Sequence, residues 1–111
     1  MNTYIWKLSK EKLNKTNLGL YSNFIKQVFK IDAQNDFNKI WKWSIENPKN
    51  FWKSVWDFTK VKGKLGNILL QESNIFFKNR FFPDSKLNYA ENLLVKNNEK
   101  PAIIFKSENG Y

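Results

Sequence analysis

Residues 41–58, WKWSIENPKNFWKSVWDF, decide the fold of this chain, because they contain a helix boundary with apolar residues on both sides of it. Asn47 is a favourable N-cap residue, and Pro48 suits the first helical position, where its missing N–H costs nothing. Trp52 and Trp56 follow with the four-residue spacing of one helix face. We therefore expect a helix that begins at Pro48.

The same helix should end near residue 62. Lys60 and Lys62 complement the negative end of the helix dipole, and Gly63 can adopt the left-handed conformation that terminates a helix. Two further helices are expected upstream, over residues 16–29 and from Asp36. Their apolar rows at four-residue spacing are Leu20, Phe24 and Val28, then Tyr21, Ile25 and Phe29, and in the second helix Phe37, Trp41 and Ile45 with Ile40 alongside.

Downstream, residues 63–80 are short apolar runs separated by Gly, Asn and Ser, which indicates irregular strands or extended connections. Residues 81–94, FFPDSKLNYAENLL, then combine two features. Asn88 and Glu91 form a capping box, which predicts a helix from residue 89 to about residue 95. The preceding Phe-Phe-Pro is costly to expose, and we expect it to be covered by parts of a larger protein that lie outside this sequence.

Composition excludes several classes of site. The 111 residues contain neither Cys nor His, so thiol nucleophiles, zinc–thiolate sites and histidine-based triads cannot be built. Aromatic residues make up 17% of the chain, which favours a domain docked on something larger. No secretory signal or membrane span is recognisable, so we expect a cytoplasmic protein with no membrane partner.

The pattern at the end of the sequence predicts a hairpin whose second strand is missing. Residues 102–105, AIIF, have the pattern of a buried strand, and Asn109-Gly110 is a favoured two-residue hairpin turn. Only one residue follows this turn, and an unpaired strand edge is an aggregation hazard that native proteins avoid. We therefore expect the chain to be cut short within a larger fold.

Three segments together resemble a known family. Residues 41–58, 81–94 and 101–110 resemble the N-terminal portion of acyl-CoA synthetases of the acetyl-CoA synthetase type, and most closely the acetoacetyl-CoA synthetases (acetoacetate–CoA ligases). Leu93 and Leu94 favour this branch, because acetyl- and propionyl-CoA synthetases usually carry Asp-Arg-His in that region. Asp84 departs from the glycine that is commoner in the family.

The resemblance implies an α+β fold. It consists of an aromatic-rich helical domain over residues 1–80, followed by the first helix and strand of a large AMP-binding (adenylating) domain over residues 81–111, incomplete here. The complete enzyme is expected to use ATP, Mg²⁺ and CoA to convert acetoacetate into acetoacetyl-CoA, and the rest of the synthetase is the expected partner. Because the family's phosphate loop and catalytic lysine lie elsewhere, we expect no catalytic, cofactor-binding or metal-binding residue here. The residues expected to have structural roles are Trp41, Trp52, Trp56, Phe82, Pro83, Asn88 and Glu91.

Alternative interpretations stay open at this point. The tryptophans, Trp43 included, could stack on nucleic-acid bases, but helical spacing favours core packing. The net charge of +9 suggests nucleic-acid or acidic partners, yet Arg80 is the single arginine and the lysines are scattered, which disfavours nucleic acid. Glu91 has no titratable partner for acid–base catalysis, and its capping role suffices to explain it. A ligase for acetate or propionate is the remaining alternative.

Overall fold

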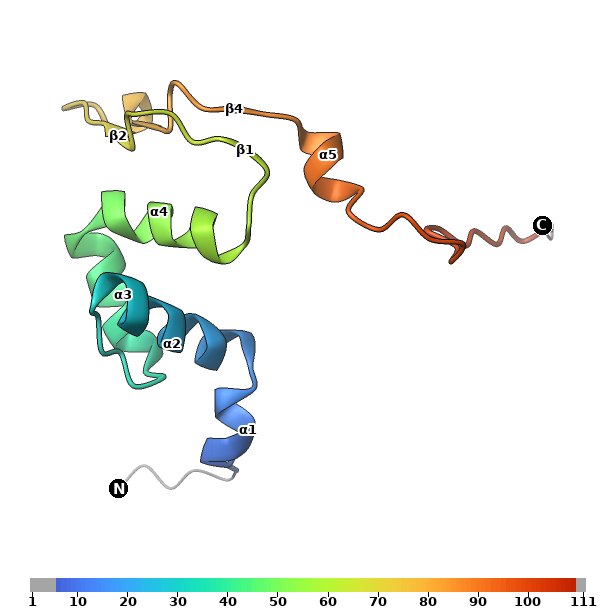
Figure 1. Ribbon diagram of the computed structural model, residues 1–111, viewed down its shortest axis with the longest axis horizontal. Coiled ribbons are helices and arrows are strands. Elements are labelled where there is room, and N and C mark those ends of the chain that lie inside the picture. Colours follow the sequence, from blue (N-terminus) through green and yellow to red (C-terminus); the bar gives the residue numbers. More distant parts are fainter. Residues whose placement is uncertain (1–5, 110–111) are drawn as a thin grey trace.

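The computed structural model describes residues 6–109, which form helices and very short strands (Figure 1). The helices are α1 (Lys10–Asn14), α2 (Asn17–Phe29), α3 (Phe37–Glu46), α4 (Pro48–Phe58), a 3₁₀ turn η1 (Phe76–Lys78) and α5 (Tyr89–Leu93). The strands are β1 (Gly63–Lys64), β2 (Leu70–Gln71), β3 (Arg80–Phe81) and β4 (Lys86–Leu87). The expected mixture of helices with short strands is therefore present. Helix α1 is too short to give a periodic signal, so it was not expected from the sequence.

Helices α2, α3 and α4 pack around a small core. Ile25, Ala33, Ile40 and Trp43 are buried in it, and partly buried side chains of α2, α4 and the loop between α2 and α3 surround them. Helix α4 contacts both α2 and α3. These three helices form the part of the chain that we call the helical unit.

The helix starts follow the sequence signals. Asp36 caps α3, since its carboxylate accepts from the Asn38 N–H at 2.8 Å, and Pro48 occupies the start of α4. The end of α4 differs from expectation. Lys60, with φ of 55°, takes the left-handed position, and the Val61 N–H donates to the Trp56 carbonyl at 3.2 Å. The helix therefore ends at Phe58 in a Schellman-type termination, with the left-handed position three residues before Gly63.

Gly63 instead lies in β1, opposite Leu87 of β4. A Cβ atom at this position would lie 2.7 Å from both the Leu87 Cβ and the Lys86 carbonyl oxygen. The close approach of the two strands, together with a φ of 154°, explains why glycine stands there.

One of the expected apolar rows points away from the core, and another is divided. On α2, Leu20 and Val28 are about half exposed, whereas Phe24 of the same row packs against the core beside the fully buried Ile25. On α3, the core takes Ile40 and Trp43, while the row of Phe37, Trp41 and Ile45 faces outward. The expectation that Trp41 packs in the core of this unit is therefore wrong. The reason is geometric, because a helix with apolar residues on two faces can turn only one of them to a given core.

The strands form two separate antiparallel pairs. In one, β1 pairs with β4, and in the other, β2 pairs with β3, so that Leu70 is opposite Phe81. These pairs connect residues 63–71 with residues 80–87. The domain boundary at residues 80 and 81 stays a prediction.

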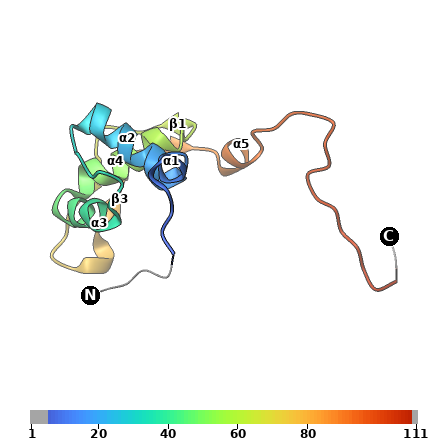
Figure 2. The same cartoon turned by 90° about the horizontal axis from the view of Figure 1, so that it is seen from below.

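Beyond α5 the chain leaves the helical unit, as Figures 1 and 2 show. Helix α5 ends at Leu93, two residues earlier than expected, and residues 102–105 form no strand. Ile103, Ile104 and Phe105 are largely exposed, because none of residues 6–109 forms a strand beside them that could accept and donate their ladder hydrogen bonds. The Asn109-Gly110 turn lies partly outside the described residues. Over residues 6–109, no helix is both long and apolar enough to span a membrane.

Candidate functional site

An aromatic joint connects α4 with the β3 region. Trp52 and Phe81 have ring centroids 5.6 Å apart, and Trp56 and Phe82 have theirs 5.4 Å apart, both in inclined geometries that aromatic pairs favour. We call these four residues the aromatic joint. The expectation that only absent parts of a larger protein cover the two phenylalanines is therefore wrong, since α4 supplies part of the cover. The cover is incomplete, because Trp52 and Phe81 remain 42% and 43% exposed.

The backbone of Phe82 turns sharply at this joint. Its φ is 49°, a left-handed conformation that costs a non-glycine residue about 1–2 kcal/mol. Two hydrogen bonds hold it, since the Phe82 N–H donates to the Leu69 carbonyl at 3.1 Å and its carbonyl accepts from Ser85 at 3.0 Å. Pro83 lies in the exposed turn that this second bond closes. The turn directs the Phe82 ring back toward Trp56.

Asp84 fastens a second loop to this turn. Its carboxylate oxygens accept from the backbone N–H groups of Asn67, at 2.8 Å, and Ile68, at 3.2 Å. The Asn67 N–H is the main reason that the pKa of the Asp84 carboxyl lies below its ordinary value. Gly66 has φ of 82°, and any Cβ there would collide with this carboxylate. The aspartate thus stabilises the turn rather than weakening it.

We predict that the Asp84 contact weakens in acid. Its pKa is lower in the folded state than in the unfolded chain, so its contribution is complete above about pH 4 and is lost as pH falls through the folded value. The Asn67 amide proton shift, followed by NMR, should titrate with a midpoint below about 3.9, the ordinary Asp value. Asp84→Asn should abolish this titration. A midpoint at the ordinary value would show that the hydrogen bonds are not formed in solution.

Asn92 attaches α5 to the end of the helical unit. Its amide oxygen accepts from the Lys62 N–H at 2.7 Å, and its amide nitrogen donates to the carbonyls of Lys62 and Asn88, both at 2.8 Å. Asn88 caps α5 by accepting from the Glu91 N–H at 3.2 Å. The return bond of the capping box, in which the Asn88 N–H would donate to the Glu91 carboxylate, is not formed between these described residues, and Glu91 is exposed.

Asn92→Ala should loosen α5 by about 1–2 kcal/mol, since a side-chain hydrogen bond contributes about 1 kcal/mol net and backbone groups of Lys62 can rebind water. Amide hydrogen exchange at Lys62 should accelerate about tenfold for each 1.4 kcal/mol lost. Asn97→Ala, in the exposed turn beyond α5, is the matched control and should leave Lys62 exchange unchanged. Equal effects of both variants would contradict a specific role for Asn92.

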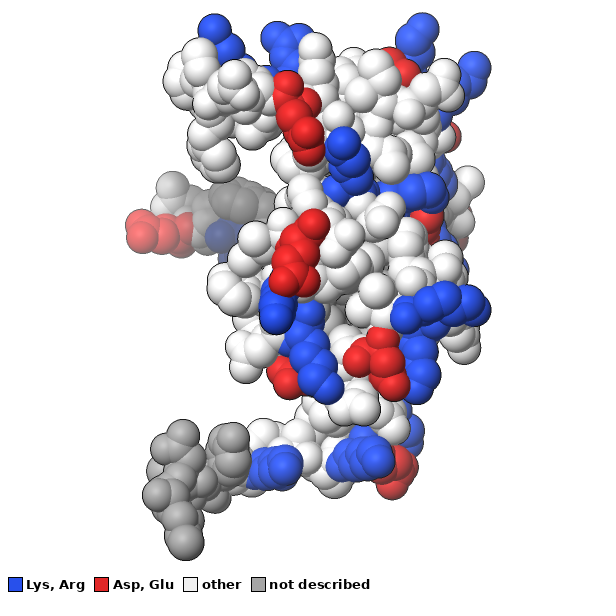
Figure 3. Space-filling model, turned by 90° about the vertical axis from the view of Figure 1, so that its left-hand side faces the viewer, with Lys and Arg blue, Asp and Glu red and all other residues white. Residues whose placement is uncertain are grey.

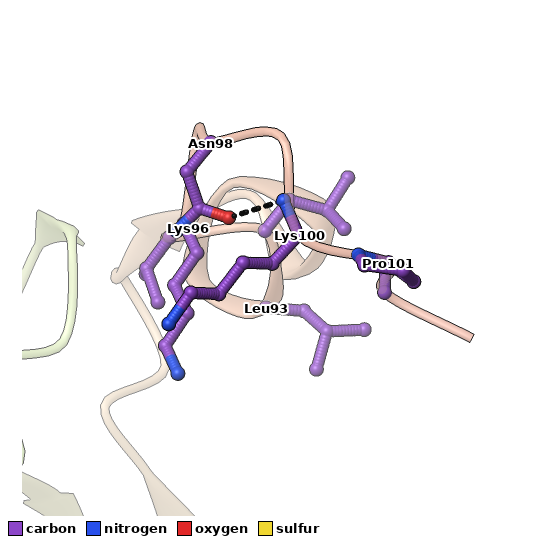
Figure 4. Close-up of a pocket in the computed structure, with 8 residues that line it drawn as sticks. Leu93, Lys96, Asn98, Lys100 and Pro101 are labelled. Carbon is purple, nitrogen blue, oxygen red and sulfur yellow. Dashed lines mark hydrogen bonds between the residues drawn. The ribbon is translucent and has the colours of Figure 1, made fainter. Parts of the chain in front are cut away.

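Other surfaces offer little chemistry. A hollow of about 670 Å³ is formed by residues 93–102 alone (Figure 4), where the Asn98 side chain accepts from the Lys100 N–H at 3.0 Å. In residues 6–109, no three Asp or Glu side chains gather closely enough to hold a metal ion. Basic and acidic side chains are interspersed over the face in Figure 3. The described residues also form exposed ion pairs, such as Lys42–Glu46 at 3.8 Å. This face has no continuous basic patch.

The structure thus brings most of the expected structural residues to one region. Trp52, Trp56 and Phe82 meet at the aromatic joint, and Pro83 lies in the exposed turn directly after it. Asn88 and Glu91 lie one strand further at the start of α5, and Trp41 lies apart on the outer face of α3. Asn92 was not among the expected residues, because the contacts that attach it to the helical unit are made with Lys62, 30 residues away. Asp84 does stand out in the sequence, as a departure from the family pattern.

Comparison with known proteins covers this same region. A family model described as "Acetyl-coenzyme A synthetase N-terminus" matches residues 37–93. The acetoacetyl-coenzyme A synthetase of Rhizobium meliloti (strain 1021) is 38% identical over 73 residues, which are 66% of this chain and 11% of that protein. The acetoacetyl-CoA synthetase of Xenopus tropicalis is 33% identical over 76 residues, again 66% of this chain and 11% of that protein. That of Danio rerio is 28% identical over 99 residues, 84% of this chain and 14% of that protein.

The chain therefore spans about one tenth to one seventh of the length of these relatives. No solved structure matches it.

Proposed function

Because the chain belongs to the acetyl-coenzyme A synthetase N-terminus family, we propose that it is the N-terminal structural part of an acetoacetate–CoA ligase. The complete ligase would join acetoacetate to CoA with ATP and Mg²⁺, releasing AMP and pyrophosphate. The observation that carries this proposal is the family match over residues 37–93, which contain α3, α4, the aromatic joint and α5. Six curated relatives, each an acetoacetyl-CoA synthetase, support the choice of acid.

In this proposal the chain contributes scaffolding and no reacting group. The aromatic joint and the Asp84 turn fix the path of the backbone from α4 to β4, and Asn92 fixes the start of the segment that follows. Without Cys or His, acid–base or nucleophilic chemistry would have to come from carboxylates, lysines or tyrosines. The remainder of the ligase is the proposed partner, and ATP, Mg²⁺ and CoA would bind there.

The test is ATP–pyrophosphate exchange. The ligase-length product of the same gene should exchange pyrophosphate into ATP when acetoacetate is supplied, because adenylation is reversible. The 111-residue chain alone should give only background. Exchange by the short chain, in a preparation free of host synthetase, would contradict the scaffolding role.

The choice of acid separates the proposal from its nearest alternative. Acetate and propionate should each support far slower exchange than acetoacetate at equal concentration. Faster exchange with acetate or propionate would assign the chain to a sibling ligase.

A further inference from the structure

Helix α3 presents apolar residues on two opposite sides. Ile40 and Trp43 fill the core of the helical unit, whereas Phe37, Trp41 and Ile45 are 64%, 56% and 59% exposed. We call these three exposed residues the outer ridge. They follow one another at four-residue spacing, so they form one continuous stripe along the helix. A helix that is apolar on both sides is typical of one packed between two layers, and only one layer is supplied here.

The uncovered area of the chain is large. The accessible surface is 10186 Å², whereas a compact protein of this mass exposes about 6,500 Å². The radius of gyration is 19.2 Å, compared with about 13 Å for a compact domain of similar length. Part of the excess comes from the extended residues 94–109. The accessible surface beyond that of a compact protein is about 3,700 Å². This area is more than four times the roughly 800 Å² that one partner contributes to a standard interface.

Resting on the proposed function, we propose that the outer ridge is the surface on which the adenylating part of the same ligase packs. The family match begins at Phe37, the first ridge residue, and includes the whole ridge. The matched relatives have more than four fifths of their length outside the matched segment, which is ample chain to supply the second layer. The exposed Leu20 and Val28 of α2 lie outside the family match, and the proposal does not include them.

Two other occupants fit less well. A second copy of this chain would bring two molecules of charge +9 together, so like-charge repulsion opposes it. An anionic lipid surface favours a row of unpaired lysines beside an apolar stripe, whereas here Lys42 is paired with Glu46 at 3.8 Å and Asp36 directly precedes the ridge. A partner within the same polypeptide needs no charge attraction, because its effective concentration is set by the connecting chain.

The first experiment compares side-chain footprints. Hydroxyl-radical labelling with mass spectrometry is run on the 111-residue chain and on the ligase-length product of the same gene. Trp41 should be labelled at least about fivefold more slowly in the long chain, because the centre of a packed interface is as inaccessible as a protein interior. Trp6, which is 74% exposed and precedes the family match, is the internal control and should react equally in both chains.

The second experiment uses matched variants. Trp41→Lys should leave the cooperative unfolding of the 111-residue chain unchanged but should restore fast labelling of Phe37 and Ile45 in the long chain. Trp6→Lys should do neither. If Trp41→Lys instead unfolds the short chain, the ridge belongs to the core of the helical unit and the proposal is wrong.

Failure of the outer-ridge proposal is distinguishable from failure of the proposed function. A long chain that exchanges pyrophosphate with acetoacetate yet leaves Trp41 freely labelled would overturn the ridge proposal alone. Protection of Trp41 in a long chain without any ligase activity would support the ridge and overturn the function. Protection in the short chain that grows with its concentration, or that requires anionic phosphatidylserine vesicles, would assign the ridge to a second copy or to a lipid surface instead.

Discussion

Trp43→Ala should destabilise the helical unit by about 3–5 kcal/mol, the usual range for truncation of a large buried aromatic side chain. Trp43 is only 7% exposed, and its ring contacts the rings of Phe29 and Phe51 at centroid distances of 5.8 and 5.9 Å. The indole therefore holds α2, α3 and α4 together. Urea unfolding of the 111-residue chain, followed by far-ultraviolet circular dichroism, measures the change in the free energy of unfolding. A Trp43→Ala variant that is already unfolded without urea would correspond to the upper end of the expected loss.

The control is Trp41→Ala, two residues away on the same helix. Because Trp41 faces outward, its truncation in the 111-residue chain should change the free energy of unfolding by less than about 1 kcal/mol. The two variants remove the same side chain from the same helix, so helix propensity cancels. Equal losses would mean that α3 is rotated in solution relative to the structure.

The contrast between these two tryptophans shows where sequence reasoning reaches its limit. Local signals placed the start of α3 at Asp36 and that of α4 at Pro48, because a cap or a proline acts on its own first turn. Which face of a helix turns toward the core is decided by contacts with other helices and not by local signals. Helix α3 has apolar residues on two sides, and nothing in the spacing says which side meets α2 and α4.

The β region was less predictable for a related reason. Its ladders are two residues long, too short for an alternating pattern, and they depend on contacts distant in sequence, such as Asp84 with Asn67. Residues 102–105 show the converse case. Their strand pattern is strong, but a strand is defined by its partner, and none of the described residues supplies one. The sequence indicates that Phe81 and Phe82 need to be covered. It does not indicate that Trp52 and Trp56 provide part of that cover.

Ile25→Ala should cost about 2–5 kcal/mol, because a fully buried aliphatic side chain loses its transfer energy and leaves a cavity. Its position in the centre of α2, between Tyr21 and Phe29, gives the surrounding rings little freedom to collapse into the space. Nearby, the Tyr21 hydroxyl is tied to Ser54 at 2.5 Å, which further restricts that movement. The expected loss is therefore in the upper half of the range, measured by urea unfolding of the 111-residue chain.

Val28→Ala is the matched control on the same helix. By spacing alone, the row that contains Val28 and the row that contains Ile25 are equivalent. Val28 is 55% exposed, however, so its truncation should lower the free energy of unfolding by less than about 1 kcal/mol. Both changes raise helix propensity by replacing a β-branched residue with alanine, so the difference between them reports burial together with the one additional methylene that is removed at Ile25. A loss at Val28 as large as that at Ile25 would show that Val28 is buried in solution, which contradicts its exposed position in the structure.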